Sequence, residues 1–191
     1  MPPLTPEQLI ARQSFIGGSD AASICGVNKH RTAHEVYLEK IGQGKPVIET
    51  EAMRWGAIHE ANIAEEYQRR TGRTQILVPE SIVHPVQGFM GCHVDRKQRD
   101  QNTGREGIAE IKTTRRRLAK GECPESYQIQ LYHNLICTQL TWGTVVILIQ
   151  GSEMVWYDFL LTEQISRSIV TLESKFWAAV VAKDWSLFGV E

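Results

Sequence analysis

The chain has 191 residues, of which 42% are hydrophobic and 23% are charged. This length and composition are typical of a single globular domain, and they exclude a disordered or fibrous chain. The 21 basic and 22 acidic residues give a formal net charge of −1, which argues against a protein that coats nucleic acid through bulk charge. They do not exclude a metal-dependent enzyme that acts on nucleic acid, because a metal site needs carboxylates of its own.

Targeting signals are not expected from this sequence. The longest apolar run, residues 145–149, has the length of a strand rather than of a membrane span. Residues 1–7 have neither a basic start nor a long apolar core, so we expect no secretory signal. No two of the four cysteines form a Cys-x-x-Cys pair, so we expect neither a structural zinc nor an iron–sulfur centre, and free thiols fit a cytoplasmic protein.

The first third of the chain predicts short helices. The expected segments are 5–14, 20–26 and 32–42. Gly17 and Gly18 separate the first two, Ser19 or Asp20 is expected to cap the second, and Thr32 to cap the third.

A longer helix is expected from about Thr50 to Thr71, where Gly72 ends it. One face carries apolar or small residues at helical spacing, namely Met53, Gly56, Ala57, Ala64 and Tyr67. Glu60 falls in the middle of this stripe. An acid among core-facing residues is either misplaced by the prediction or has a partner that compensates its desolvation.

The rest of the chain alternates between strands and helices. The expected strands are 75–78, 81–84, 89–95, 107–113, 144–150 and 154–161, and the expected helices are 125–137 and 163–182. This order predicts an α/β domain whose mixed central sheet is flanked by helices.

Two of these strands bring acidic residues together. In the strand 89–95, His93 and Asp95 share one face, and in the strand 107–113 Glu110 and Lys112 do the same. A hairpin folded at 102–103 sets Asp95 opposite Glu110, with Cβ atoms ~5 Å apart.

Facing carboxylates repel each other unless a positive charge lies between them. Mg²⁺ prefers oxygen ligands and is often held by one or two carboxylates together with phosphate oxygens and water. Lys112 can orient an attacking water or balance charge on a phosphate, and Glu60 can add a further acid. The residues alone leave an alternative open, because a Glu-x-Lys pair on a strand is usually a solvated face.

Five segments occur in order along the chain, namely Ile16–Ala22, Arg54–Glu60, His93–Asp95, Glu110–Lys112 and Gln128–Tyr132. Together they resemble the YqaJ-type viral recombinase nucleases, the family of phage lambda exonuclease within the PD-(D/E)xK superfamily. The resemblance spans about Arg12 to Trp177 and implies a restriction-endonuclease-like core. It implies one nuclease domain over 1–191, with an end-binding helical part over about 1–48 and a catalytic core over about 50–182.

The resemblance also implies residue roles. Metal ligands are Asp95, Glu110, the Ile111 carbonyl and Glu60; Lys112 positions the attacking water and Gln128 completes the site from its helix. Arg12 and Ser19 receive a terminal 5′-phosphate, for which an Arg and a serine at a helix start are chemically suitable.

Two positions depart from the family pattern. Val94 replaces the proline of the superfamily name, which makes no metal bond. His93 replaces a small hydroxyl residue near the phosphate, so it is either a further phosphate donor or a packed strand histidine.

Basic and aromatic residues also lie near these motifs. Arg115, Arg116, Arg117 and Lys120 follow the Glu-x-Lys strand and are expected to contact DNA, with a solvated loop as the alternative. Arg69, Arg70 and Arg73 are expected to be solvated or helix-terminus charges, and Trp55 and Trp142 to lie in the core.

The resemblance implies a Mg²⁺-dependent exonuclease that degrades one strand of linear duplex DNA from 5′ to 3′ and leaves a 3′ single strand for recombination. It also implies two metal ions, with Mn²⁺ as a substitute, a homotrimer around DNA, and a single-strand annealing partner. An endonuclease or a nuclease of other polarity with this fold, and a non-catalytic DNA-end-binding module, remain alternatives.

Overall fold

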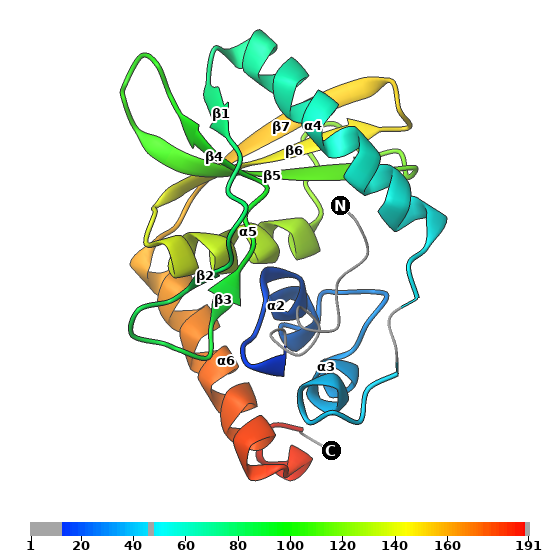
Figure 1. Cartoon of the computed structure of the whole chain (residues 1–191), viewed down its shortest axis with the longest axis vertical. Coiled ribbons are helices and arrows are strands. Elements are labelled where there is room, and N and C mark those ends of the chain that lie inside the picture. The colour runs from blue at the N-terminus through cyan, green and yellow to red at the C-terminus, as the bar shows by residue number, and fades with distance from the viewer. Residues whose placement is uncertain (1–12, 46–47, 190–191) are drawn as a thin grey trace.

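A five-stranded mixed sheet forms the centre of the protein (Figure 1). The computed structural model describes residues 13–45 and 48–189. The strands lie in the order β1 (Thr74–Ile76), β4 (Arg96–Arg99), β5 (Glu106–Thr114), β6 (Trp142–Ile149) and β7 (Glu153–Leu160). Only β5 and β6 pair in parallel, and the other neighbours in this sheet are antiparallel. The predicted mixed α/β fold is therefore confirmed.

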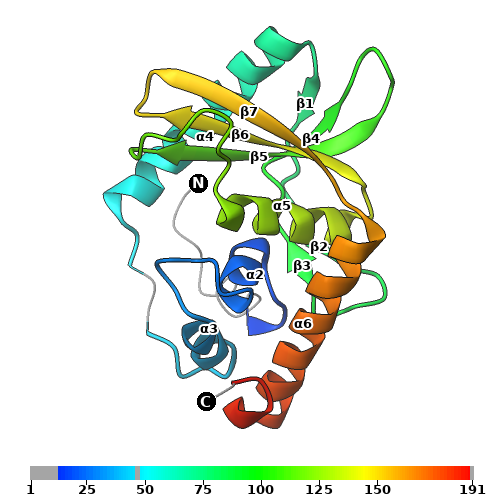
Figure 2. The same ribbon diagram turned by 180° about the vertical axis from the view of Figure 1, so that it is seen from behind.

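Helices cover both faces of this sheet. Helix α4 (Glu51–Thr71) crosses one face, whereas α5 (Glu125–Thr138) lies on the other and connects β5 to the parallel β6 (Figures 1 and 2). Beyond α5 lie α2 (Gly18–Ile24), α3 (Ala33–Lys40) and α6 (Glu163–Ala182), which a short 3-10 helix, η1 (Trp185–Leu187), follows. None of the helices in the described ranges combines the length and apolar composition that crossing a membrane requires.

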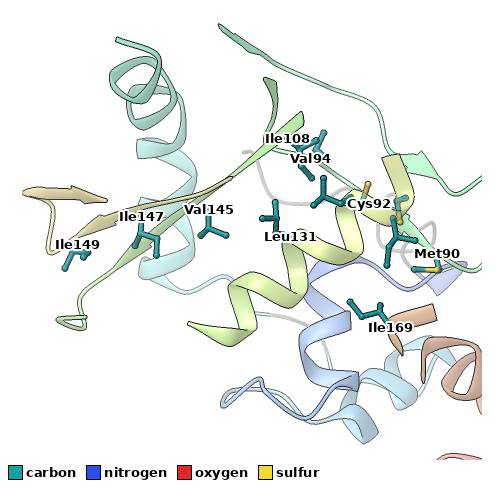
Figure 3. Close-up of a cluster of buried hydrophobic side chains, with 12 residues drawn as sticks. Met90, Cys92, Val94, Ile108, Leu131, Val145, Ile147, Ile149 and Ile169 are labelled. Carbon is teal, nitrogen blue, oxygen red and sulfur yellow. The ribbon is translucent and has the colours of Figure 1, made fainter. Parts of the chain in front are cut away.

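Alternate side chains of β5 and β6 pack against different helices on the two faces of the sheet. Ile108, Val145 and Ile147 pack with Leu131 of α5 in the larger core cluster (Figure 3). The intervening residues, including Ala109 and Ile111 of β5, pack against α4 instead. Since alternate residues of a strand share a face, Glu110 and Lys112 point to the α5 side of the sheet.

The predicted ends of the longer helices are confirmed. Thr50 caps α4 by accepting a hydrogen bond from the Met53 amide at 3.2 Å, and Gly72 ends the helix with φ of 72°. Thr32 likewise caps α3.

Helix α2 begins earlier than expected. Gly17 is its N-cap, so Ser19 and Asp20 lie inside the first turn rather than before it. The physical reason is that the Asp20 carboxylate, inside the helix, accepts a hydrogen bond from the Gly17 amide at 3.0 Å. This bond satisfies a backbone N–H group that has no partner within the helix. The expected helix over 5–14 lies largely outside the described residues.

The apolar stripe of α4 is buried over only part of its length. Its buried residues are Ile63, Ala64 and Tyr67. Met53 is 51% exposed and Trp55 is 49% exposed, so the expectation that Trp55 lies in the core is wrong, whereas Trp142 is buried as expected.

The expected strand over 89–95 forms only in part, and it does not belong to the main sheet. Gly91–Cys92 forms β3, which pairs with β2 (Ile82–Val83) in a separate two-stranded sheet, and the main-sheet strand begins only at Arg96. The hairpin register is nevertheless as predicted, because Arg96 pairs with Ala109 and Arg99 with Glu106. Asp95 therefore lies one residue before β4, at the position that continues this register towards Glu110.

A buried ion pair joins α5 to α6. The ring Nδ1 of His133 lies 2.9 Å from Glu173 Oε1, and its Nε2 lies 2.9 Å from the Gly91 carbonyl. Both partners are acceptors, so both ring nitrogens carry a proton. Burial opposes the charge, but the Glu173 carboxylate and these hydrogen bonds raise the pKa of His133 to about 9.

Candidate metal centre and DNA-end site

Glu110 is the most enclosed acid of the predicted site. It lies in the middle of β5 and is 2% exposed. Oε1 accepts hydrogen bonds from Lys112 Nζ at 2.7 Å and from Gln130 Nε2 at 2.6 Å, and Oε2 accepts one from Asn134 Nδ2 at 2.9 Å. These donors compensate the cost of burying the carboxylate and fix its orientation.

Asp95 lies beside this carboxylate. Its Oδ2 accepts a hydrogen bond from the Ile111 amide at 2.7 Å, which holds the aspartate against β5. Burial and the negative charge of Glu110 raise the pKa of Asp95 to about 8, while Lys112 opposes the shift. The hydrogen bond to Ile111 thus holds Asp95 at the peptide group that follows Glu110 on β5, and a cation bound there would offset the repulsion between the two acids.

Glu60 is held by a residue that the sequence analysis did not select. Its Oε1 lies 2.7 Å from Nη1 of Arg96, and the same nitrogen donates to the Asp95 carbonyl. Arg96 is thus the partner that compensates the desolvation of Glu60. It also places a positive charge between the helical acid and the backbone of Asp95.

The donor set fits a hard divalent cation. Within 13–45 and 48–189, no three His, Cys, Asp or Glu side chains are arranged as a metal-binding group, in keeping with the pairing of Glu60 with Arg96. Two carboxylates, Asp95 and Glu110, remain beside the Ile111 peptide group. Mg²⁺ keeps several waters and commonly uses only one or two carboxylates, so this oxygen-rich pair suits it.

The two glutamines of α5 have different partners. The Gln128 amide donates to the Cys123 carbonyl at 2.8 Å, whereas Gln130 contacts Glu110. Gln130 and Asn134 are four residues apart, so they lie on one helical face. This spacing of two amides beside apolar positions was the signal in the sequence that could have selected them.

Asn134 also connects the metal centre to the N-terminal helices. A Cβ atom on Gly18 would lie 2.3 Å from Asn134 Oδ1 and 3.1 Å from Gln130 Cγ. Helix α2 packs on α5 at this point, and the absence of a side chain on Gly18 allows the close approach. Asn134 Oδ1 is buried and has no hydrogen-bond donor among the described residues.

The predicted phosphate-binding residues are distributed around this contact. Ser19 is exposed on the first turn of α2, next to Gly18. His93 is exposed, and its Nε2 lies 2.7 Å from Ser81 Oγ. Arg12 lies outside the described residues.

The basic run after β5 is exposed. Arg115, Arg117 and Lys120 are exposed, and Arg116 is exposed but ion-paired with Glu122. By contrast, the expectation for Arg73 is wrong, because this side chain is 16% exposed and forms a two-pronged pair with Asp158.

Comparison with known sequences identifies the family. The sequence profile described as "YqaJ-like viral recombinase domain" matches residues 8–141. The chain belongs to this family. "Uncharacterized protein YqaJ" of Bacillus subtilis (strain 168) is 34% identical over 179 residues, which cover 90% of this chain and 54% of that protein. The chain thus spans about half the length of this YqaJ-like relative.

Solved structures share the fold of this YqaJ-like chain. An alkaline exonuclease from Laribacter hongkongensis, LHK-Exo, superposes with a TM-score of 0.78 at 21% identity, covering 94% of each chain. A phage-related exonuclease from Haemophilus somnus 129PT gives 0.64 at 10% identity, covering 88% of this chain and 96% of that one. The family and the nuclease-type fold expected from the sequence motifs are therefore confirmed.

Proposed function

We propose that this chain is a Mg²⁺-dependent exonuclease that degrades one strand of linear duplex DNA from its 5′ end and leaves a 3′ single strand for recombination. The observation that carries the proposal is the meeting of Asp95, Glu110 and Lys112 at the middle of β5, in a chain of the YqaJ-like family. Two solved structures that share its fold are those of exonucleases, which supports the same reaction class.

In the proposed site, Asp95, Glu110 and the Ile111 carbonyl would hold the cation. A bound Mg²⁺ would offset the charge that builds on the scissile phosphate and assist ionisation of the attacking water. Mn²⁺ has the same ligand preference and is expected to substitute. Glu60 remains the proposed acid for a second cation, and it would have to exchange Arg96 for that role.

Lys112 is the proposed positioning group for the attacking water. Its Nζ is held 2.7 Å from Glu110 Oε1 and lies 5.7 Å from the centre of the Tyr127 ring. Burial lowers the pKa of Lys112, but Glu110 and Asp95 together raise it, so the amine stays protonated and donates. Gln128 keeps its proposed role of completing the site, and Gln130 supports Glu110 directly.

The chemistry regenerates its own substrate end. Water attacks the phosphorus between the first two nucleotides, the bond from phosphorus to O3′ breaks, and O3′ takes up a proton. The shortened strand then carries a new 5′-phosphate, so the terminal phosphate proposed to bind Arg12, Ser19 and His93 is available in every cycle. The basic run from Arg115 to Lys120 would follow the DNA backbone.

The family resemblance extends the proposal to assembly and context. A homotrimer would encircle the duplex, a single-strand annealing protein would receive the 3′ strand, and the reaction would take place in the cytoplasm.

The test uses linear duplexes with 5′-phosphate or 5′-hydroxyl ends and a closed circular duplex, each with Mg²⁺ or with EDTA. The proposal predicts release of 5′-mononucleotides from phosphorylated linear ends only when Mg²⁺ is present. Cleavage of the circle would indicate an endonuclease instead, nucleotide release from the 3′ end would indicate opposite polarity, and end binding without cleavage would leave a non-catalytic module.

A further inference from the structure

A pocket of about 660 Å³ lies on the α4 face of the sheet, and of its lining residues only Arg115 has a role described above. It opens between the first half of α4 and the ends of β5 and β6, and its lining includes Trp55, His59, Thr113, Arg115 and Gln150. Thr113 follows Lys112 directly on β5. Because neighbouring residues of a strand point to opposite faces, the pocket and the Lys112 side chain lie on opposite faces of the sheet near the same end of β5.

The wall formed by α4 is an exposed aromatic pair. Trp55 and His59 are four residues apart on the helix, and their rings stack with centroids 5.4 Å apart and planes 21° from parallel. Trp55 is 49% exposed although the same helix buries Tyr67 completely. A large ring left open beside a pocket, rather than turned into the core, offers a flat apolar face to a ligand.

The wall formed by the ends of β5 and β6 includes polar and basic residues beside the apolar Leu148. Arg115 is exposed at the end of β5 and begins the basic run described above, and the Thr113 side chain lines the pocket. An aromatic face and an arginine in the lining of one pocket match a nucleotide, whose base stacks on rings while its phosphate pairs with arginine. Among the described residues, no acidic side chain lines this pocket.

We propose that this pocket binds one nucleotide of single-stranded DNA, with the base stacked on Trp55 and the adjacent phosphate on Arg115. The inference rests on the proposed function for the nature of the ligand. It adds a base-stacking site for an unpaired nucleotide on the α4 face of the sheet. Such a site is tolerant of sequence, because every base has a π face.

Binding without cleavage tests the proposal. The full chain in EDTA is titrated with a fluorescent duplex that carries a single-stranded extension, using wild type, Trp55→Ala, Trp55→Phe and Ile58→Ala. Stacking of one base predicts a loss of affinity of roughly 5- to 150-fold for Trp55→Ala and most of the affinity retained in Trp55→Phe. Ile58 is the matched control, because it is also 49% exposed on α4 but does not line the pocket.

An abasic scan of the extension then locates the nucleotide. Removal of one particular base should weaken binding to wild type and leave binding to Trp55→Ala unchanged, since the variant has already lost that contact. Equal affinity of wild type and Trp55→Ala, or the same loss in Ile58→Ala, would overturn the proposal.

The proposed function is tested separately, by digestion of a blunt 5′-phosphorylated duplex by the wild-type protein with Mg²⁺. Digestion without any effect of Trp55 on binding refutes the stacking site alone. Binding that depends on Trp55 without digestion refutes the exonuclease alone.

Discussion

A single methyl group on Gly18 is predicted to disturb the metal centre from outside it. The new Cβ would lie 2.3 Å from Asn134 Oδ1, closer than non-bonded atoms approach. Asn134 must therefore move, and Glu110 loses the hydrogen bond to its Oε2. Gln130, whose Cγ lies 3.1 Å from the same Cβ position, must also shift, which disturbs its hydrogen bond to Glu110 Oε1.

Two opposing effects set the stability of Gly18→Ala. Alanine favours a helix over glycine by at most ~1 kcal/mol, whereas overpacking of a buried contact costs ~1–3 kcal/mol. Gly18 is buried in the first turn of α2, so the clash outweighs the gain. We expect a net loss of about 1 kcal/mol, which lowers the Tm by roughly 2–4 °C in a protein of this size.

The effect on catalysis should exceed the effect on stability. Loss of a hydrogen bond that orients a metal ligand typically reduces activity or metal affinity by about 10- to 100-fold. We therefore expect such a decrease in the rate of Mg²⁺-dependent nucleotide release by a Gly18→Ala protein that remains folded. Gly88→Ala is the matched control, because a Cβ at Gly88 meets no atom within 4 Å.

A double variant tests whether the effect passes through Asn134. In Gly18→Ala/Asn134→Ala the clashing amide is absent, so the stability cost of Gly18→Ala should shrink while activity stays as low as in Asn134→Ala. Residues in direct contact show coupling of ~0.5–3 kcal/mol in such cycles. A Gly18→Ala protein with wild-type Tm and activity, or strictly additive variants, would refute the reasoning.

Two further predictions concern polar contacts away from the metal. The pKa of His133 in the folded protein is about 9, above its ordinary value of 6.5. The ion pair with Glu173 therefore contributes its full stabilisation, at most ~3 kcal/mol, below pH 6.5. This contribution is lost as the pH rises through 9. Urea unfolding between pH 6 and 9.5 should show this decline in wild type and little of it in Glu173→Gln; equal slopes would contradict it. Arg73→Lys keeps the charge but loses the two-pronged pair with Asp158 and the hydrogen bond to Tyr67. We therefore expect a loss of about 1 kcal/mol in unfolding free energy. An unchanged urea midpoint would argue against a stabilising role of these Arg73 contacts.

Local signals in the sequence were sufficient for the ends of α4 and for the hairpin register. Thr50 and Gly72 bound α4 because a hydroxyl cap and a left-handed glycine act through neighbouring residues alone. The centre of the turn at 102–103 likewise determined that Arg96 pairs with Ala109.

Strand β4 was missed because its inward positions are polar. Arg96 and Gln98 are buried, and they are satisfied by Glu60 on α4 and by the Ile108 carbonyl and Thr144 on the sheet. Such a strand has no alternation of apolar and polar residues. Its stability depends on partners distant in the sequence, which a search for apolar periodicity does not detect.

Some contacts of the candidate site could be predicted from the sequence, and others depend on how distant elements pack. The meeting of Asp95, Glu110 and Lys112 follows from strand geometry and register, which the sequence determines locally. The contacts of Gln130 and Asn134 with Glu110 depend on how α5 lies across β5, and the close approach of Gly18 depends on how α2 packs on α5. The exposure of Trp55 could not be predicted either, because helical periodicity does not say where along α4 the sheet ends.

The most direct test of the proposed metal centre is cleavage by Glu110→Gln. This substitution keeps the shape of the side chain but removes the charge that would hold the cation. Glu106→Gln, on an exposed residue of the same strand, is the control. We predict that Glu110→Gln retains the wild-type Tm to within a few degrees and loses at least ~100-fold of Mg²⁺-dependent nucleotide release from a 5′-phosphorylated duplex. A Glu110→Gln protein that digests this duplex at the wild-type rate would contradict the account.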